Sequence, residues 1–133
     1  MAKKMQTFKI AGSPVYVGQS ALEELRYNLT TLFVNKESIF VLADDNTDKL
    51  CYPLLAGMVP QIERAYKIVI PAGEDQKTLQ TCEQVWNQMA VAGANRKSLL
   101  INLGGGMVSD LGGFAASVFH RGKIGRASCR ERV

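Results

Sequence analysis

Three mostly apolar runs divide the chain and predict buried strands. They cover residues 39–43, 66–70 and 99–103. Each is largely continuous rather than alternating, which is typical of strands covered on both faces. Two shorter strand-like pieces, residues 8–10 and 15–17, flank Gly12-Ser13-Pro14, a combination that suits a hairpin turn.

Helical spacing dominates between the predicted strands. Leucines at 22, 25, 29 and 32, together with a Ser20–Glu23 capping pair, predict a helix over about residues 20–33. Further helices are predicted after residue 46 to about Met58, from Thr78 to near Gly93, and over 108–119. Strands that alternate with helices indicate βαβ units. The predicted fold class is therefore α/β, with a Rossmann-like, mainly parallel sheet and flanking helices.

Each predicted buried strand ends in unusual polar or flexible residues. The first ends in Asp44-Asp45-Asn46, the second leads through Gly73 into Glu74-Asp75-Gln76-Lys77, and the third ends in Gly104-Gly105-Gly106. Parallel sheets bind ligands beyond the carboxyl ends of their strands. The pattern therefore predicts one binding site at this edge of the sheet.

The glycine triplet has two interpretations. Glycines at a strand-to-helix junction let the backbone approach a phosphate, whose charge the amino end of the next helix favours. The alternative is a tight turn that needs positive φ angles. Ser109 occupies the third glycine position of the usual dinucleotide fingerprint, so the match to that fingerprint is incomplete. Gly112-Gly113 and Ala115-Ala116 indicate a helix packed closely on a sheet.

The polar residues at the strand ends also leave alternatives open. Asp44 and Asn46 suit hydrogen bonds to ribose hydroxyls, whereas Asn46 or Thr47 would also serve as a helix N-cap. Glu74 and Lys77, three residues apart, have the spacing of an exposed ion pair.

The end of the last predicted helix offers one further phosphate ligand. Arg121 can hold a phosphate with two parallel hydrogen bonds, or it can complement the carboxyl end of that helix. The neighbouring His120 is the only histidine of the chain. A single histidine and three scattered cysteines provide no cluster of three or four zinc ligands.

Composition narrows the class of protein. The 133 residues are 47% hydrophobic and 21% charged, as in one soluble globular domain. The formal net charge is +4, and three arginines and one glutamate in the last ten residues supply +2 of it. The remaining charge is small and scattered, which argues against a nucleic-acid partner.

The number of cysteines and the hydropathy of the chain indicate the cellular compartment of the protein. Cys51, Cys82 and Cys129 form no C-x-x-C pair and are odd in number, which favours a reducing cytoplasm over a disulfide framework. Cys51 and Cys82 are predicted to be small buried hydrophobes. No apolar run approaches the roughly 20 residues of a membrane span. We expect a cytoplasmic protein with no membrane partner.

Motifs with the right spacing give the chain a family resemblance. They are G-E-x-x-K-T at residues 73–78, L-G-G-G-x-x-x-D-L-x-G-F-x-A at 103–116 and H-R-G at 120–122, with D-x-N at 44–46. Over residues 8–124 the chain resembles the amino-terminal domain of 3-dehydroquinate synthases. The G-G-G-x-x-x-D piece also occurs in iron-type polyol and alcohol dehydrogenases and in glycerol-1-phosphate dehydrogenase, whereas the other pieces favour the synthases.

The resemblance implies an activity and its cofactors. It implies an NAD-dependent lyase of the shikimate pathway, and so of chorismate and aromatic amino acid biosynthesis, acting in the cytoplasm as a homodimer. The substrate would be a phosphorylated sugar acid, 3-deoxy-D-arabino-heptulosonate 7-phosphate, and the products 3-dehydroquinate and phosphate. Half of a metal-dependent, NAD-linked polyol dehydrogenase and a non-catalytic nucleotide-binding module are the alternatives.

The resemblance also implies roles for individual residues. In that family Asp44 and Asn46 would contact the adenosine side of NAD, and Glu74 and Lys77 the ribose and nicotinamide region. The remaining contacts are Gly105, Gly106 and Met107 to the pyrophosphate, Asp110 to the nicotinamide end, and Arg121 to the substrate phosphate. The family also binds a divalent metal, zinc or cobalt, through one glutamate and two histidines of a helical carboxy-terminal domain. Those ligands are absent from this chain, so we expect it to be inactive alone.

The last residues depart from the family pattern. Residues 1–124 form the expected NAD-binding α/β domain, whereas 125–133 are polar, basic and unpatterned. At that point the family continues into a strand. We expect residues 125–133 to be a foreign or frameshifted terminus of a truncated chain, with a genuine disordered tail as the alternative.

Overall fold

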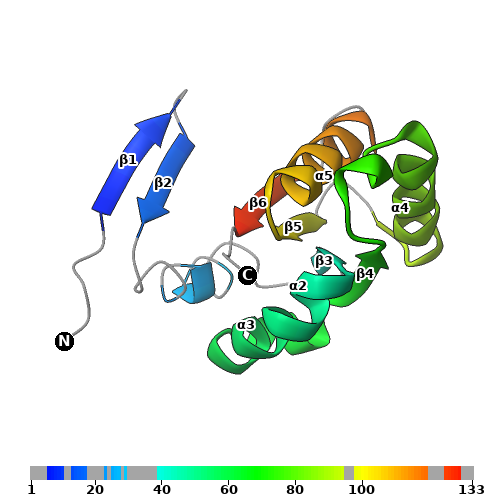
Figure 1. The fold of residues 1–133 in the computed structure, drawn as a ribbon. Coiled ribbons are helices and arrows are strands. Elements are labelled where there is room, and N and C mark those ends of the chain that lie inside the picture. Colours follow the sequence, from blue (N-terminus) through cyan, green and yellow to red (C-terminus); the bar gives the residue numbers. More distant parts are fainter. Residues whose placement is uncertain are drawn as a thin grey trace.

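A four-stranded parallel sheet forms the centre of the described chain (Figure 1). The computed structural model describes residues 6–10, 13–17, 23, 25–27, 29, 39–94, 98–119 and 125–129. The strand order is β4-β3-β5-β6. The strands are β3 (Ile39–Asp44), β4 (Tyr66–Ile70), β5 (Leu99–Leu103) and β6 (Gly125–Cys129). All three predicted strands and the Rossmann-like fold class are confirmed. The prediction that each strand is covered on both faces is wrong for β4, an edge strand in which Tyr66, Lys67 and Val69 are exposed.

The helices cover both faces of this sheet (Figure 1). One face carries α2 (Asp45–Leu50), α3 (Tyr52–Met58) and the short 3₁₀ helix η1 (Pro60–Arg64). The other face carries α4 (Leu79–Val91) and α5 (Gly106–Val118). The extents of α4 and α5 agree with the predicted helices to within two residues.

The helix predicted to run to Met58 is divided in two. It ends as α2 at Leu50 and restarts as α3 at Tyr52, with Cys51 between them. Pro53 lies in the first turn of α3 and explains the break. Proline has no backbone N–H, and its ring clashes with the carbonyl four residues earlier, so a continuous helix is not possible there.

The chain before β3 is described in part. Strands β1 (Gln6–Ile10) and β2 (Ser13–Val17) form an antiparallel hairpin in which Phe8 lies opposite Val15. The predicted hairpin is therefore confirmed, although Ser13 and Pro14 belong to a strand and not to the turn. Residues 23, 25–27 and 29 are helical, as predicted for 20–33, and the rest of that range lies outside the described residues.

The tail contains a strand that its sequence pattern does not predict. Residues 125–129 form β6, which runs parallel to β5 with Leu103 opposite Cys129. Backbone hydrogen bonding at a sheet edge does not depend on side-chain patterning, which is why an unpatterned segment can extend the sheet. The foreign or frameshifted origin of residues 125–133 stays a prediction.

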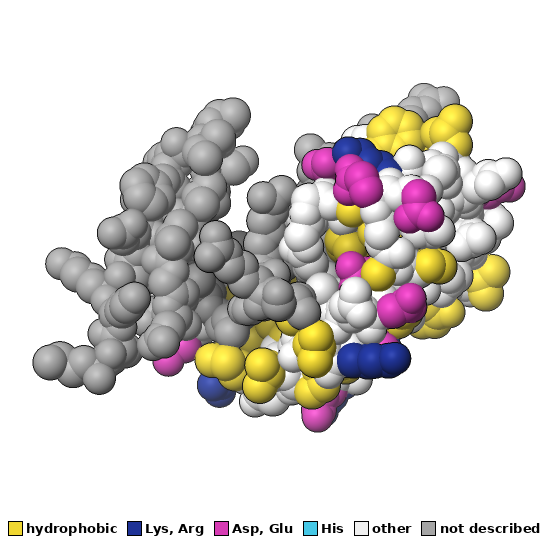
Figure 2. All heavy atoms as spheres, viewed as in Figure 1, with side chains coloured by type: hydrophobic (Ala, Val, Ile, Leu, Met, Phe, Trp, Pro, Cys, Tyr) yellow, Lys and Arg dark blue, Asp and Glu magenta, His cyan; other side chains and the backbone are white. Residues whose placement is uncertain are grey.

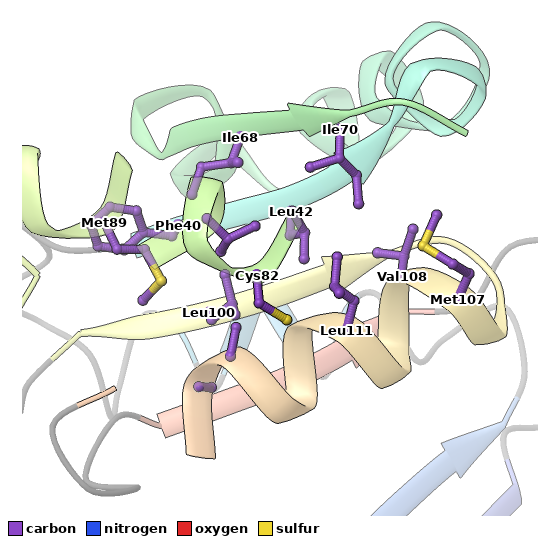
Figure 3. Close-up of a cluster of buried hydrophobic side chains, with 13 residues drawn as sticks. Phe40, Leu42, Ile68, Ile70, Cys82, Met89, Leu100, Met107, Val108 and Leu111 are labelled. Atoms are coloured by element: carbon purple, nitrogen blue, oxygen red, sulfur yellow. The ribbon is translucent and has the colours of Figure 1, made fainter. Parts of the chain in front are cut away.

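The two faces of the sheet bury separate apolar clusters. Alternate residues of β3 point to opposite faces, so Phe40 and Leu42 pack under α4 and α5 while Val41 and Ala43 pack under α2 and α3. Figure 3 shows the first cluster, in which Leu111 and Val108 reach from α5 toward Leu42. Helix α5 is thus seated directly on the central strands.

No helix within the described ranges is long and apolar enough to cross a membrane. The two described cysteines, Cys51 and Cys82, are buried and form no disulfide with each other, which confirms their prediction as small hydrophobes. Burial raises the pKa of the Cys82 thiol above its ordinary value.

Candidate functional site

Successive strands of the chain are added on opposite sides of β3. The chain passes from β3 to β4 on one side and then returns to place β5 on the other side of β3. Such a switch point opens a crevice at the carboxyl ends of the two diverging strands, where α/β proteins bind ligands. Strand β3 ends at Asp44, and β5 is followed directly by Gly104. The topology therefore brings together two of the three strand ends at which a binding site was predicted.

Asp44 is the N-cap of α2. Its Oδ1 accepts hydrogen bonds from the backbone N–H groups of Asn46 at 2.9 Å and Thr47 at 2.8 Å. The hydroxyl of Thr47 accepts one in return from the Asp44 N–H at 3.0 Å, which completes a capping box. The prediction that Asn46 or Thr47 is the cap is wrong, because α2 already begins at Asp45, directly after the end of β3.

The cap leaves part of the Asp44 carboxylate available. Among the described residues no hydrogen bond to its Oδ2 is found, and the residue is partly exposed. Asn46 is exposed in the first turn of α2. The cap and the ligand-binding interpretations of Asp44 are therefore compatible, since they use different oxygens of one carboxylate.

The glycine triplet forms an open junction between β5 and α5. Gly104 has a φ of +156°, and a Cβ there would lie 3.0 Å from Val108 Cγ2, so a side chain at this position would be strained. Gly105 is the N-cap of α5 without any side-chain cap hydrogen bond, and a Cβ on it would meet no atom within 4 Å. Gly105 and Gly106 are exposed. The amino end of α5 is thus exposed at Gly105 and Gly106, where the orphan N–H groups and the dipole of a helix favour an anion.

Met107 has a different position from its two glycine neighbours. Its side chain is 9% exposed and packs in the cluster of Figure 3. Only its backbone is therefore suited to the predicted contact with a pyrophosphate.

A lysine joins the segment after β4 to helix α5. Lys77 Nζ lies 3.0 Å from Asp110 Oδ2 and 3.4 Å from Glu74 Oε1. Glu74 begins the short 3₁₀ helix η2 (Glu74–Gln76), which Gly73 enters with a φ of +120°. Figure 2 shows acidic side chains gathered beside a basic one at the surface. The Glu74–Lys77 pair was predicted from spacing, whereas the contact with Asp110, 33 residues further on, has no local sequence signal.

The two carboxylates change the titration of this lysine. The hydrogen bond and charge of Asp110, followed by those of Glu74, raise the pKa of Lys77 above its ordinary value of 10.5. A raised folded-state pKa means that the stabilisation from the pair is fully present below pH 10.5 and is lost as pH rises through the folded-state value. The two carboxylates therefore stabilise the protonated form of Lys77.

This titration can be measured directly. We expect the side-chain NMR signals of Lys77 to titrate above pH 10.5 in the unmodified chain. Asp110→Asn removes the largest cause of the shift, so it should bring the midpoint back toward the ordinary value. A midpoint that does not move in Asp110→Asn would contradict the 3.0 Å contact.

The structure thus places Asp44, Lys77 and the glycine loop at one edge of the sheet, with Glu74 and Asp110 around the lysine. Arg121, the predicted phosphate ligand, lies outside the described residues, and its role stays a prediction. Within the described ranges no three His, Cys, Asp or Glu side chains are placed to hold a metal ion.

Fold and site together define a Rossmann-like α/β domain whose polar loops meet at the switch point of its sheet. Residues 67–125 match the family described as 3-dehydroquinate synthase N-terminal. Over most of its length the chain is similar to the amino-terminal part of 3-dehydroquinate synthases.

Curated relatives show this similarity. The chain is 39% identical over 108 residues to a 3-dehydroquinate synthase of Parabacteroides distasonis, an alignment covering 81% of this chain and 30% of the relative. It is 38% identical over 116 residues to one of Pyrococcus abyssi, covering 84% and 30%. The chain spans about 30% of the length of the curated relatives it matches.

Solved structures agree on the fold. A 2-deoxy-scyllo-inosose synthase superposes with a TM-score of 0.73 at 19% identity, covering 96% of this chain and 35% of that one. The 2-epi-5-epi-valiolone synthase of Streptomyces hygroscopicus, with NAD⁺ and Zn²⁺ bound, has a TM-score of 0.59 at 24% identity, covering 75% and 28%. At these identities the likeness concerns the fold alone.

Proposed function

We propose that the chain forms the NAD-binding part of a 3-dehydroquinate synthase. In this proposal the whole enzyme converts 3-deoxy-D-arabino-heptulosonate 7-phosphate into 3-dehydroquinate and phosphate, in the cytoplasm and as a homodimer. The observation that carries the proposal is the 3.0 Å contact between Lys77 and Asp110 beside the switch point. It joins two motifs that resemble those of the synthases, and the relatives from Parabacteroides distasonis and Pyrococcus abyssi bear that name.

The residues at this edge fit a dinucleotide. The exposed backbone at Gly105 and Gly106 suits a pyrophosphate, because the amino end of α5 favours negative charge. The unused Oδ2 of Asp44 suits a ribose hydroxyl. Lys77, Glu74 and Asp110 would orient the nicotinamide half through their shared ion pairs. Bound NAD would supply a reversible hydride acceptor.

A divalent metal does not fit the described part of this chain. Related structures carry NAD⁺ with Co²⁺ or Zn²⁺, but the described residues provide no set of three ligands. We therefore assign no metal ligand to the described residues. In the proposal Arg121 binds the phosphate of the sugar acid.

Calorimetry and a phosphate assay test the proposal together. Titration of NAD⁺ into the 133-residue chain should give saturable binding, and its absence would contradict the cofactor role. For the reaction, the chain is joined to the remaining part of the Parabacteroides distasonis relative and assayed for phosphate release. Release from the heptulosonate phosphate supports the proposal. Release from glucose 6-phosphate instead would assign the domain to a cyclase with another substrate.

The carboxylate at the end of β3 predicts cofactor selectivity. We expect NAD⁺ to bind at least about fivefold more tightly than NADP⁺, which corresponds to about 1 kcal/mol. The charge of Asp44 would repel a 2′-phosphate, while its free oxygen accepts a hydrogen bond from the ribose hydroxyl. Parallel titrations of both cofactors measure the ratio. Tighter binding of NADP⁺ would refute the assignment of Asp44.

A further inference from the structure

A glycine in the middle of α5 has an unexpected position. Gly112 is buried at the centre of a 13-residue helix, where glycine is disfavoured relative to alanine. A Cβ at Gly112 would overlap the Oδ1 atom of Asn102 and lie 2.6 Å from its Cγ and 3.0 Å from its Nδ2. The amide of Asn102 thus occupies the volume that a side chain on α5 would fill.

Asn102 is equally unusual on its own strand. All five residues of β5 are buried, and Asn102 is the polar one among four apolar residues, with 1% exposure. It lies opposite Leu42 in the register of β3 and β5. Leu42 and Leu100 both belong to the cluster under α4 and α5 (Figure 3), and Asn102 shares the face of Leu100 because side chains alternate along a strand.

The close approach at this point affects the functional end of α5. The same helix carries the open N-cap at Gly105 and the carboxylate of Asp110. About one turn after Gly112 the helix is also tied to α4, because Trp86 Nε1 donates a hydrogen bond to the Ala115 carbonyl at 3.0 Å. A helix moves nearly as a rigid body, so any added separation at Gly112 is transmitted along α5 to both ends.

We propose that Asn102 and Gly112 form a matched pair that sets how closely α5 packs on β5. The pair thereby positions Asp110 and the amino end of α5 at the edge of the sheet. Neither residue reaches the site itself, so both act as positioning residues.

Melting temperatures of four variants test the pairing. Gly112→Ala should lower the melting temperature by roughly 5 °C or more, because the new methyl group has no room. In the Asn102→Ala background the same substitution should cause no further decrease. Gly57→Ala is the matched control, since Gly57 is an exposed helical glycine at which an added Cβ would meet no atom within 4 Å. If Gly112→Ala is tolerated as well as Gly57→Ala, the pairing is refuted.

A second readout separates positioning from stability. Trp86 is the only tryptophan, so its single indole N–H resonance reports the distance between α4 and α5. That resonance should shift in Gly112→Ala and return in the Asn102→Ala/Gly112→Ala double variant. An unchanged resonance in folded Gly112→Ala would leave the pair a purely local packing feature and overturn the positioning role.

Nucleotide affinity provides a third readout, which rests on the proposed function. Folded Gly112→Ala should bind NAD⁺ at least about fivefold more weakly, and the double variant should recover most of that loss. If the unmodified chain does not bind NAD⁺, the proposed function fails, and the Trp86 resonance alone decides the positioning role. If the resonance shifts while affinity for NAD⁺ stays constant, α5 moves without consequence for the site and the functional part of the inference is wrong.

Discussion

Replacing Gly105 with serine is expected to weaken NAD⁺ binding about a hundredfold without lowering the melting temperature. Gly105 has φ −84° and ψ −158°, a conformation that serine readily adopts as an N-cap. The serine hydroxyl would accept hydrogen bonds from the first N–H groups of α5, the same groups that are proposed to bind the phosphates. Hydrogen bonds to a charged group contribute roughly 1.5–3 kcal/mol, and each 1.4 kcal/mol is about tenfold in affinity.

The neighbouring glycine gives a matched control for this prediction. Gly104→Ser should lower the melting temperature, because Gly104 has a φ of +156° and its Cβ would lie 3.0 Å from Val108 Cγ2. Adjacent serine substitutions thus have opposite expected effects, one on binding and one on stability. Thermal unfolding and calorimetry of both variants measure them. If Gly105→Ser binds NAD⁺ as tightly as the unmodified chain, the phosphates do not bind at the amino end of α5.

The strands and helices were predictable because their signals are local. The runs at 39–43 and 99–103 needed only hydropathy, and burial of every residue of β5 explains why four of its five residues are apolar. Pro53 causes the division between α2 and α3. The position of this break could have been predicted from the sequence, because proline interrupts helices. Strand β6 has no such signal, because a parallel edge pairs with backbone rather than with a side-chain pattern.

The site was predictable in composition but not in geometry. The residues at the strand ends indicated which edge binds a ligand, since parallel strands place their carboxyl ends together. Asp44 is the N-cap of α2 because it is also the last residue of β3 and therefore has an extended conformation, with ψ of 177°. The contact of Lys77 with Asp110 depends on how α5 packs on the sheet. That packing in turn depends on Asn102 and Gly112, whose steric relation no spacing in the sequence reveals.

Replacing Lys77 with methionine is expected to weaken NAD⁺ binding about thirtyfold while leaving the fold intact. Lys77 Nζ is shared between Asp110 and Glu74, at 3.0 and 3.4 Å. Methionine keeps much of the aliphatic length but leaves two carboxylates uncompensated beside the edge where the phosphates would bind. The two carboxylates would repel the phosphates of NAD⁺, and this repulsion is present only when NAD⁺ is bound. The free chain is little affected, because exposed ion pairs contribute little to stability.

Lys67 provides the matched control for this substitution. It also pairs with an aspartate, Asp48, at 2.6 Å, and its Nζ lies 4.4 Å from the centre of the Tyr52 ring. It lies near the amino end of β4, however, away from the carboxyl edge. Lys67→Met should therefore leave the affinity for NAD⁺ unchanged, although it removes the same charge. Equal loss of affinity in both variants would show that net charge controls binding, and that Lys77 has no specific role at the site.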